Sequence, residues 1–307
     1  MPLVDHPVRS QIEAVVVAHD SAEVLPACLA ALAREGVPAI VVDNASRDGT
    51  AKVAERAGAR VVRMARNEGY GRANNAGVAA SGAAFVLIAN PDLVLDEGAA
   101  AALLAAAAAY PDAALFAPRI VEEDGRYFFQ PRSLLSGFLT NPQGVPCFPE
   151  GDCCAPFLSG ACLLVRREVF LAVGGFDPAI FLFYEDDDLC RRLSEAGHAL
   201  VHVQAAVARH GRGKSSGPAP GRIFRSRWHQ AWSRAYVSRK WGLPSPAPGM
   251  FAWNAVRSLL ALASFRRPLI ERYAGSAAGA LAFLRGRTAL GREGVLAEPG
   301  AADRSPG

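Results

Sequence analysis

The sequence predicts an α/β protein built on a doubly wound sheet, followed by a helical extension. Three observations support this fold class. Apolar, β-branched runs alternate with helical segments over residues 13–64, and their connections are short. A further apolar run at 85–89 ends in turn-forming residues. After Gly221 the chain changes to long helical segments that carry tryptophans and arginines. The alternation is typical of a parallel sheet with helices on both faces.

The predicted elements follow one another along the chain. Strands are expected at 13–18, 39–43, 59–64, 85–89, 157–165 and 200–208. Helices are expected at about 24–34 and 50–57, between 96 and 110, from 185 onward, and at 222–241, 250–264 and 268–285. Asp96 is expected to cap its helix. The segment 118–156 is less regular, with a hairpin turn expected at Asp124 and Gly125.

The composition excludes several classes of protein. The 307 residues carry a formal net charge of +4 with no long basic block, so nucleic-acid binding is not expected. No signal-peptide pattern or 18-residue apolar run occurs, and no GxGxxG motif follows the first strand. Six cysteines without a CxxC pair indicate reduced, mostly buried thiols, so a cytoplasmic protein is expected.

Polar side chains follow the first two predicted strands. His19 and Asp20 come after the first strand, Asp43 ends the second, and Asn44 follows it. Ligands of doubly wound sheets bind at the carboxyl ends of strands, so these residues are expected on the ligand-binding edge. A carboxylate such as Asp43 can accept a hydrogen bond from a ribose hydroxyl or a base imino group. The alternative is an ordinary turn or cap acid.

The segment RNEGYGRANNAGVAAS, at 66–81, combines glycines with a cation and amides at the start of a helix. Gly69 and Gly71 let the backbone approach a ligand, and the helix start offers N–H groups to phosphate. Arg72 can add a charge-assisted hydrogen bond. The alternative is a glycine-rich helix entry with a solvated arginine.

The tripeptide Asn90-Pro91-Asp92 comes directly after the strand at 85–89. A carboxylate in this place can bind a divalent cation that also contacts a diphosphate, because Mg²⁺ and Mn²⁺ take few protein carboxylates together with phosphate oxygens. The same tripeptide is also ordinary turn sequence.

Four consecutive acids, Glu185 to Asp188, begin a predicted helix after an aromatic-rich loop. The positive end of the helix dipole favours their charged forms, whereas their mutual repulsion raises the pKa of at least one of them. A carboxylate under both influences is suited to act as a general base. The alternative is an acidic first turn that stabilises a surface helix.

Together these motifs resemble the family 2 glycosyltransferases, in particular their bacterial rhamnosyltransferase-like branch. The segments that carry the resemblance occur in the family's order between about residues 12 and 240: VVVAHDS, VVDNAS, NEGYGRANNAG, ANPD, LSGACLLVRREVF, GGFD and FYEDDDLC. The resemblance implies a GT-A fold, which is a Rossmann-like doubly wound mixed sheet. It also implies a nucleotide-diphosphate sugar donor, a divalent metal ion and inversion at the anomeric carbon.

The resemblance further implies roles for individual residues. Asp186 corresponds to the general base, with Glu185 and Asp188 as supporting acids, and Asp187 stands where the family usually has valine. Asp92 corresponds to the metal and diphosphate ligand, and His210 completes a site for Mn²⁺ or Mg²⁺. The residues implied in nucleotide-sugar binding are Ala18, His19, Asp43, Asn44, Asn67, Gly71, Arg72, Asn75, Asn90 and Asp92.

The expected activity is that of an inverting glycosyltransferase. The branch implies transfer of rhamnose from dTDP-rhamnose to a glycan or a polyprenyl-diphosphate-linked acceptor in cell-envelope polysaccharide synthesis. Arg212 and Lys214 can close over the diphosphate, or they are solvated charges on a loop. Two alternatives stay open: a transferase that uses a UDP or GDP donor, and a catalytically inactive scaffold that binds nucleotide sugars.

The sequence predicts three regions: a catalytic domain at 1–221, a helical extension at 222–290 and a disordered tail at 291–307. The extension's helices are apolar, with arginines at their ends and Arg257 within. Such helices can lie in a membrane interface, which suits a peripheral location at the inner face of the cell membrane. The alternative is that they pack on the catalytic domain or on a partner in a homodimer.

Overall fold

The computed structural model describes residues 11–122, 125, 127–129, 133–137, 148–211, 215 and 220–292. The chain forms two compact units. The first contains the chain up to Ala65 together with Tyr70–Asp177 and Glu185–Gly217, and the second contains Arg66–Gly69, Pro178–Tyr184 and the chain from Pro218 onward. The predicted turn residue Asp124, the loop cations Arg212 and Lys214 and the tail from residue 293 lie outside the described residues.

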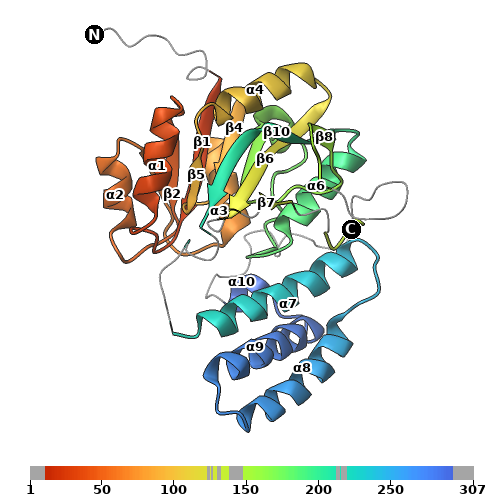
Figure 1. Cartoon of the computed structure of the whole chain (residues 1–307). Helices are drawn as coiled ribbons and strands as arrows, with labels where there is room; N and C mark the ends of the chain where they lie inside the picture. Colours follow the sequence, from red (N-terminus) through yellow and green to blue (C-terminus); the bar gives the residue numbers. More distant parts are fainter. Residues whose placement is uncertain are drawn as a thin grey trace, which may run out of the picture. The chain divides into compact units, whose positions relative to one another are not determined.

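The first unit is built on one mixed sheet with the strand order β3-β2-β1-β4-β9-β6-β10-β5 (Figure 1). Its first half is parallel, as predicted. The strands of this half are β1 (Ile12–Ala18), β2 (Ala39–Asp43), β3 (Arg60–Arg63) and β4 (Phe85–Ala89). The register pairs Ala18 with Asp43, so β1 and β2 end at the same level of the sheet.

The second half of the sheet mixes the two strand directions. β9 (Cys162–Arg166) runs antiparallel to both β4 and β6 (Ala113–Glu122). β10 (Ala199–His210) is parallel to β6, and β5 (Leu93–Leu95) pairs antiparallel with β10. Two short strands, β7 (Tyr127–Phe128) and β8 (Cys153–Cys154), pair with β6 and β10.

Two predictions for this half are wrong. Residues 118–122 were expected to be irregular but belong to β6, with Pro118 inside a central strand. The proline lacks an N–H donor, and β10 bulges beside it: the register moves from Val203–Pro118 to Val207–Arg119. The strand expected at 157–165 begins only at Cys162. Residues 157 and 158 are apolar because they are buried in the core, not because they form a strand.

Helices cover both faces of the sheet. Side chains of α1 (Leu25–Arg34), α2 (Thr50–Arg56) and α4 (Ala99–Ala109) pack in one hydrophobic cluster. Side chains of α3 (Tyr70–Ala80), α5 (Arg167–Ala172) and α6 (Glu185–Glu195) pack in another. The sequence thus folds into the layered arrangement that its alternating pattern predicts.

The start of α4 differs from the prediction. Gly98, with a φ of 81°, occupies the N-cap position, and no side chain caps the helix. The carboxylate of Asp96 instead accepts hydrogen bonds from Nε and Nη2 of Arg209 at 2.8 and 2.9 Å. This ion pair joins the loop before α4 to β10.

The second unit contains α7 (Arg222–Lys240), α8 (Ala247–Leu262), α9 (Arg267–Leu284) and the short α10 (Ala289–Arg292), which extends into the predicted tail. α9 packs against both α7 and α8 (Figure 1). A Cβ at Gly275 or Gly279 would lie 2.4 or 2.2 Å from a backbone carbonyl oxygen of α7. These glycines therefore permit a close approach of the α7 and α9 backbones.

α7 also holds the loop Pro178–Tyr184. The rings of Phe181 and His229 stack with centroids 4.4 Å apart, and Ser233 Oγ donates a hydrogen bond to the carbonyl of Leu182 at 2.8 Å. No described helix combines the length and the apolar character that crossing a membrane requires.

Candidate active site

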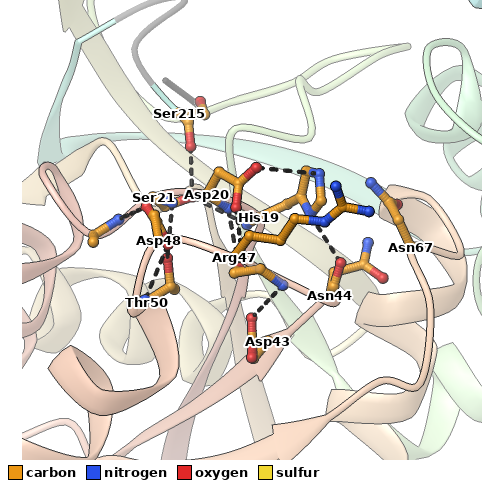
Figure 2. Close-up of polar contacts among 12 residues, drawn as sticks. His19, Asp20, Ser21, Asp43, Asn44, Arg47, Asp48, Thr50, Asn67 and Ser215 are labelled. Atoms are coloured by element: carbon orange, nitrogen blue, oxygen red, sulfur yellow. Dashed lines mark hydrogen bonds and ion pairs between the residues drawn. The ribbon is translucent and has the colours of Figure 1, made fainter. Parts of the chain in front are cut away.

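Hydrogen bonds join the loops that follow β1 and β2 (Figure 2). His19 Nδ1 donates to the carbonyl of Asn44 at 2.9 Å. The N–H of Asp20 donates to Ser46 Oγ at 3.0 Å, and the N–H of Arg47 donates to Asp20 Oδ1 at 2.7 Å. Three bonds between the same two loops fix them to each other at the carboxyl end of the parallel strands, where ligands of such sheets bind.

The structure brings the predicted residues of this edge together. The N–H of Asn44 donates to the carbonyl of Ala18 at 2.9 Å. Asp43 is buried, and its Oδ1 accepts a hydrogen bond from the N–H of Ser46 at 3.0 Å. Its other oxygen lies 3.8 Å from Arg63 Nη1. Asp43 therefore stabilises the turn at the carboxyl end of β2.

Both loops contain a residue in a left-handed conformation, Asp20 with a φ of 50° and Ala45 with a φ of 63°. Residues with a Cβ rarely adopt this region, and alanine less often than aspartate. A cost on the order of 1 kcal/mol for each persists only where surrounding contacts enforce it. The hydrogen bonds between the loops supply this constraint, and the sequence pattern singled out Asp20 but not Ala45.

A second cluster surrounds Asp92, in the loop after β4. Ser215 Oγ donates to Asp92 Oδ1 at 2.7 Å, and His210 Nε2 lies 3.3 Å from the same oxygen. Nδ2 of Asn90 lies 3.3 Å from His210 Nε2. Burial by itself would raise the pKa of Asp92, but the hydrogen bonds with His210 and Ser215 outweigh it and lower the pKa, so the carboxylate is ionised.

The donor set of this cluster fits a divalent cation. Asp92 Oδ2 is buried and has no hydrogen-bond partner among the residues that the structure describes. A buried charged oxygen without a partner is unfavourable, and a cation would satisfy it. Carboxylate, hydroxyl and imidazole groups suit Mn²⁺ and, for the oxygens, Mg²⁺. Within the described ranges no three His, Cys, Asp or Glu side chains form a metal cluster.

Ser215 connects this cluster to the β1 loop. Ser21 Oγ donates to the carbonyl of Ser215 at 2.6 Å, and the N–H of Ser21 donates to Thr50 Oγ1 at 2.9 Å (Figure 2). The family resemblance implies a serine a few residues after His210 in the metal site, and the fold brings Ser215 to Asp92.

Asp186 lies in the first turn of α6. Its Oδ2 accepts a hydrogen bond from the N–H of Gly160 at 2.9 Å, and its Oδ1 accepts one from the N–H of Asp187 at 3.0 Å. Burial raises the pKa of Asp186 above its usual value, although both hydrogen bonds oppose the rise. Its side chain is half-buried, whereas the other three acids of the run are buried.

The neighbouring acids also resist ionisation. Burial, and then the charge of Asp186, raise the pKa of Asp187 to about 7, even though its Oδ1 accepts a hydrogen bond from the N–H of Leu134 at 2.6 Å. Burial and the Asp186 charge raise the pKa of Glu185 well above its usual value. Glu185, Asp186 and Asp187 therefore all have raised pKa values, and their titrations depend on one another because the three charges are adjacent.

Asp188 has a different environment. It is fully buried, and its Oδ2 accepts a hydrogen bond from Arg192 Nε at 2.8 Å. The same guanidinium donates to the carbonyls of Val173 and Gly175 at 2.7 and 2.6 Å. Asp188 therefore holds Arg192, and Arg192 in turn holds the double-glycine turn after α5.

A short segment joins the Asp186 and Asp92 parts of the site. The carbonyl of Gly160 accepts a hydrogen bond from the hydroxyl of Tyr70 at 2.6 Å, while its N–H donates to Asp186. The next carbonyl, that of Ala161, accepts the N–H of Asn90 at 3.0 Å. Burial, followed by the charges of Glu185 and Asp186, raises the pKa of Tyr70 well above 10, so its hydroxyl stays a donor. No pattern in the sequence predicted these roles for Tyr70 or Gly160.

The remaining predicted residues have other contacts. A Cβ on Gly71 would lie 3.0 Å from Cβ of Phe176. The amide of Asn75 donates to the carbonyl of Phe176 at 2.8 Å and accepts its N–H at 2.9 Å. Arg72 is half-buried in α3. Asn67 belongs to the second unit, where its Oδ1 accepts the N–H of Gly69 at 3.0 Å.

Comparison with known proteins gives consistent results. A model described as glycosyl transferase family 2 matches residues 13–174. The chain is 33% identical over 239 residues to an N-acetylglucosaminyl-diphospho-decaprenol L-rhamnosyltransferase of Mycobacterium tuberculosis strain H37Rv, with 65% of this chain and 78% of the relative covered.

Solved structures show the same fold. A mannosyltransferase from Pyrobaculum calidifontis in complex with GDP-Man and Mn²⁺ matches with a TM-score of 0.55 and 16% identity, over 90% of this chain and 87% of that one. GalNAc-T7 with UDP, GalNAc and Mn²⁺ matches with a TM-score of 0.54 and 16% identity, over 76% of this chain and 52% of that one. These similarities confirm the predicted GT-A fold.

Proposed function

The chain belongs to glycosyl transferase family 2, and from this premise we propose that it transfers rhamnose from dTDP-rhamnose to a polyprenyl-diphosphate-linked N-acetylglucosamine, with inversion at the anomeric carbon. The rhamnosyltransferase of Mycobacterium tuberculosis, which this chain resembles over most of its length, suggests this donor sugar and acceptor. The observation that carries the proposal is the series of hydrogen bonds that joins the Asp43 edge, the Asp92 cluster and Asp186.

Asp43 and the Asp92 cluster would hold the donor. The Asp43 carboxylate stands where it can accept hydrogen bonds from the ribose or the base. Asp92 and His210, with Ser215 beside them, would hold Mn²⁺ or Mg²⁺ next to the diphosphate. When bound, such a cation would neutralise the charge that develops on the departing nucleoside diphosphate.

Asp186 is the proposed general base. It would remove the proton from an acceptor hydroxyl while that oxygen forms a bond to the anomeric carbon and the bond from this carbon to the diphosphate oxygen breaks. The carboxylate is held from both sides by the N–H groups of Gly160 and Asp187, and it is more exposed than the other acids of the run. Asp187 is the weaker candidate because it is buried and bonded to the N–H of Leu134.

The first experiment is a thermal-shift comparison of dTDP-rhamnose with UDP and GDP sugars, each with and without Mn²⁺. A ligand at about 100 times its Kd should add roughly 2.7 kcal/mol of stability. A Mn²⁺-dependent shift with dTDP-rhamnose supports the proposal. A shift with another nucleotide changes the donor, and the absence of any shift in a folded sample would contradict both donor binding by the free enzyme and the nucleotide-sugar-binding scaffold.

Two matched substitutions separate donor binding from chemistry. Asp92→Asn should abolish the Mn²⁺-dependent shift, because the amide does not replace an anionic ligand. Asp186→Asn should keep the shift but lower the rate of transfer by about 10²–10⁴-fold, as expected for the loss of a general base. Normal turnover by Asp186→Asn would show that another group takes the proton.

A further inference from the structure

One side of α8 is apolar and exposed. Six large apolar residues of this helix and the turn after it are exposed: Trp253, Val256, Leu259, Leu260, Leu262 and Phe265. Leu259 and Leu260 are each 69% exposed, and Phe265 is 91% exposed. Single exposed apolar residues are normal on a protein surface, but a contiguous group marks a surface that contacts something else.

The two uncharged polar side chains of α8, those of Asn254 and Ser258, lie toward the interior of its unit. Asn254 and Ser258 are half-buried, and Ala247 and Ala261 are buried. At 100° per residue these positions share the side of α8 that packs on α9, whereas Trp253, Val256, Leu259 and Leu260 lie on the opposite side. This is the reverse of the arrangement in a helix whose outer surface faces water.

The backbone of Phe265 has an unusual conformation. It ends the turn after α8 with a φ of 52°, a region that bulky residues seldom adopt. The most exposed large apolar side chain of the described residues is thus also held in an unfavourable conformation. Such a combination persists more readily where the side chain has a binding role.

The surroundings of this face are strongly cationic. The sequence contains no Asp or Glu from residue 196 to 270. Between residues 222 and 292 it has thirteen arginines and lysines and a single acid, Glu271, although the whole chain carries only +4. Arg257, Arg266 and Arg267 are exposed, and the guanidinium of Arg257 lies 4.5 Å from the ring centroid of Trp253.

We propose that the exposed face of α8, with Phe265, docks on the surface of an anionic lipid bilayer. The apolar side chains would enter the acyl boundary, and the arginines would contact the headgroup phosphates. At sixteen residues, or roughly 24 Å, α8 is suited to lie in the interface and not to span it. A second copy of the chain is a poorer occupant, because it would bring the same excess of positive charge to the contact.

Vesicle co-sedimentation of the full chain tests this proposal independently of donor and acceptor. The probe is vesicles of phosphatidylcholine with one third phosphatidylglycerol, against phosphatidylcholine alone. Wild type should bind the anionic vesicles, and less so at about 0.5 M salt. Leu259→Gln combined with Leu260→Gln should weaken this binding by about tenfold or more. Leu171→Gln, at an exposed leucine of α5, is the matched control and should bind as wild type.

The folded state of the variants and three possible results decide whether the face of α8 binds the bilayer. Circular dichroism should show that the variants are folded, since all three leucines are exposed. Unchanged vesicle binding by the double variant, or no binding by wild type, would overturn the proposal. So would a dimer in light scattering that the double variant converts to a monomer, because a second copy would then cover the face.

Discussion

At the scale of single residues, the acids that begin α6 differ more than their adjacency in sequence suggests. Asp188 has an arginine partner, Asp187 and Glu185 are buried with raised pKa values, and Asp186 is half-buried between two N–H groups. The run is therefore neither a simple acidic cap nor four equivalent bases. Burial separates their roles, and the sequence alone does not report burial.

The raised pKa values predict the pH dependence of transfer. The base must be ionised, so kcat/KM should rise with pH through the pKa of Asp186, which burial raises above its usual value. Asp187→Asn removes a neighbouring negative charge, so the rising limb should move to lower pH. A pH–rate profile of both proteins checks this, and a limb that stays in place would contradict the coupling.

At the scale of elements, the double-glycine turn before α6 depends on Arg192. Its guanidinium joins Asp188 to the carbonyls of Val173 and Gly175. Arg192→Ala leaves a fully buried carboxylate without its partner, so the free energy of unfolding should fall by about 3–5 kcal/mol. Urea denaturation measures this loss. Adding Asp188→Asn to Arg192→Ala should recover part of it, and strict additivity of the two substitutions would argue against the pairing.

The packing of α3 on the sheet depends on Gly77. A Cβ there would lie 2.4 Å from Cγ1 of Val15 and 2.9 Å from Cγ2 of Val42. Gly77→Ala should therefore lower stability by about 1–3 kcal/mol through overpacking. Gly82→Ala is the matched control, since a Cβ at Gly82 meets nothing within 4 Å. Equal melting temperatures of the two variants would show that Val15 and Val42 can shift to make room for the added methyl group at little cost in stability.

Much of the sheet was predictable because its strands are uninterrupted apolar runs. The strands ending at Ala18, Asp43 and Ala89 lie within a residue of their predicted bounds, and so the polar residues that follow them were placed on the correct edge. Pro118 led to the wrong prediction of an irregular segment, because a bulge in the neighbouring strand β10 accommodates the proline within β6. Tyr70 and Gly160 were missed because their hydrogen-bond partners, Gly160 and Asp186, lie 90 and 26 residues away in the sequence. Local patterns do not encode such contacts.

At the scale of the whole molecule, the loop Pro178–Tyr184 connects the C-terminal helices along the chain to the proposed base. This loop leads directly into Glu185 and Asp186, and α7 holds it through the Phe181–His229 stack and the Ser233 hydrogen bond. Phe183 and Tyr184, the last two residues of the loop, have φ values of 70° and 68°, which such residues rarely adopt. The conformation before the proposed base therefore depends on contacts with α7.

Loss of one of these contacts should affect turnover more than donor affinity. Ser233→Ala removes the hydrogen bond to Leu182 and should lower stability by about 1 kcal/mol. We expect kcat to fall several-fold while the donor KM stays near its wild-type value, because no donor-binding group is altered. Steady-state kinetics measure both. Ser276→Ala is the control, since the hydroxyl of Ser276 donates to the carbonyl of Arg272 in its own helix. An equal fall in kcat in this variant would contradict a specific role of the Ser233 hydrogen bond.

The position of the aromatic residues has a practical consequence for spectroscopy. All four tryptophans, at positions 228, 232, 241 and 253, belong to the second unit. Intrinsic tryptophan emission is therefore a local optical label for that unit, and the sheet contributes nothing to it. A change in emission on adding a nucleotide sugar would show that the second unit responds to the donor, and it is readable without any extrinsic dye.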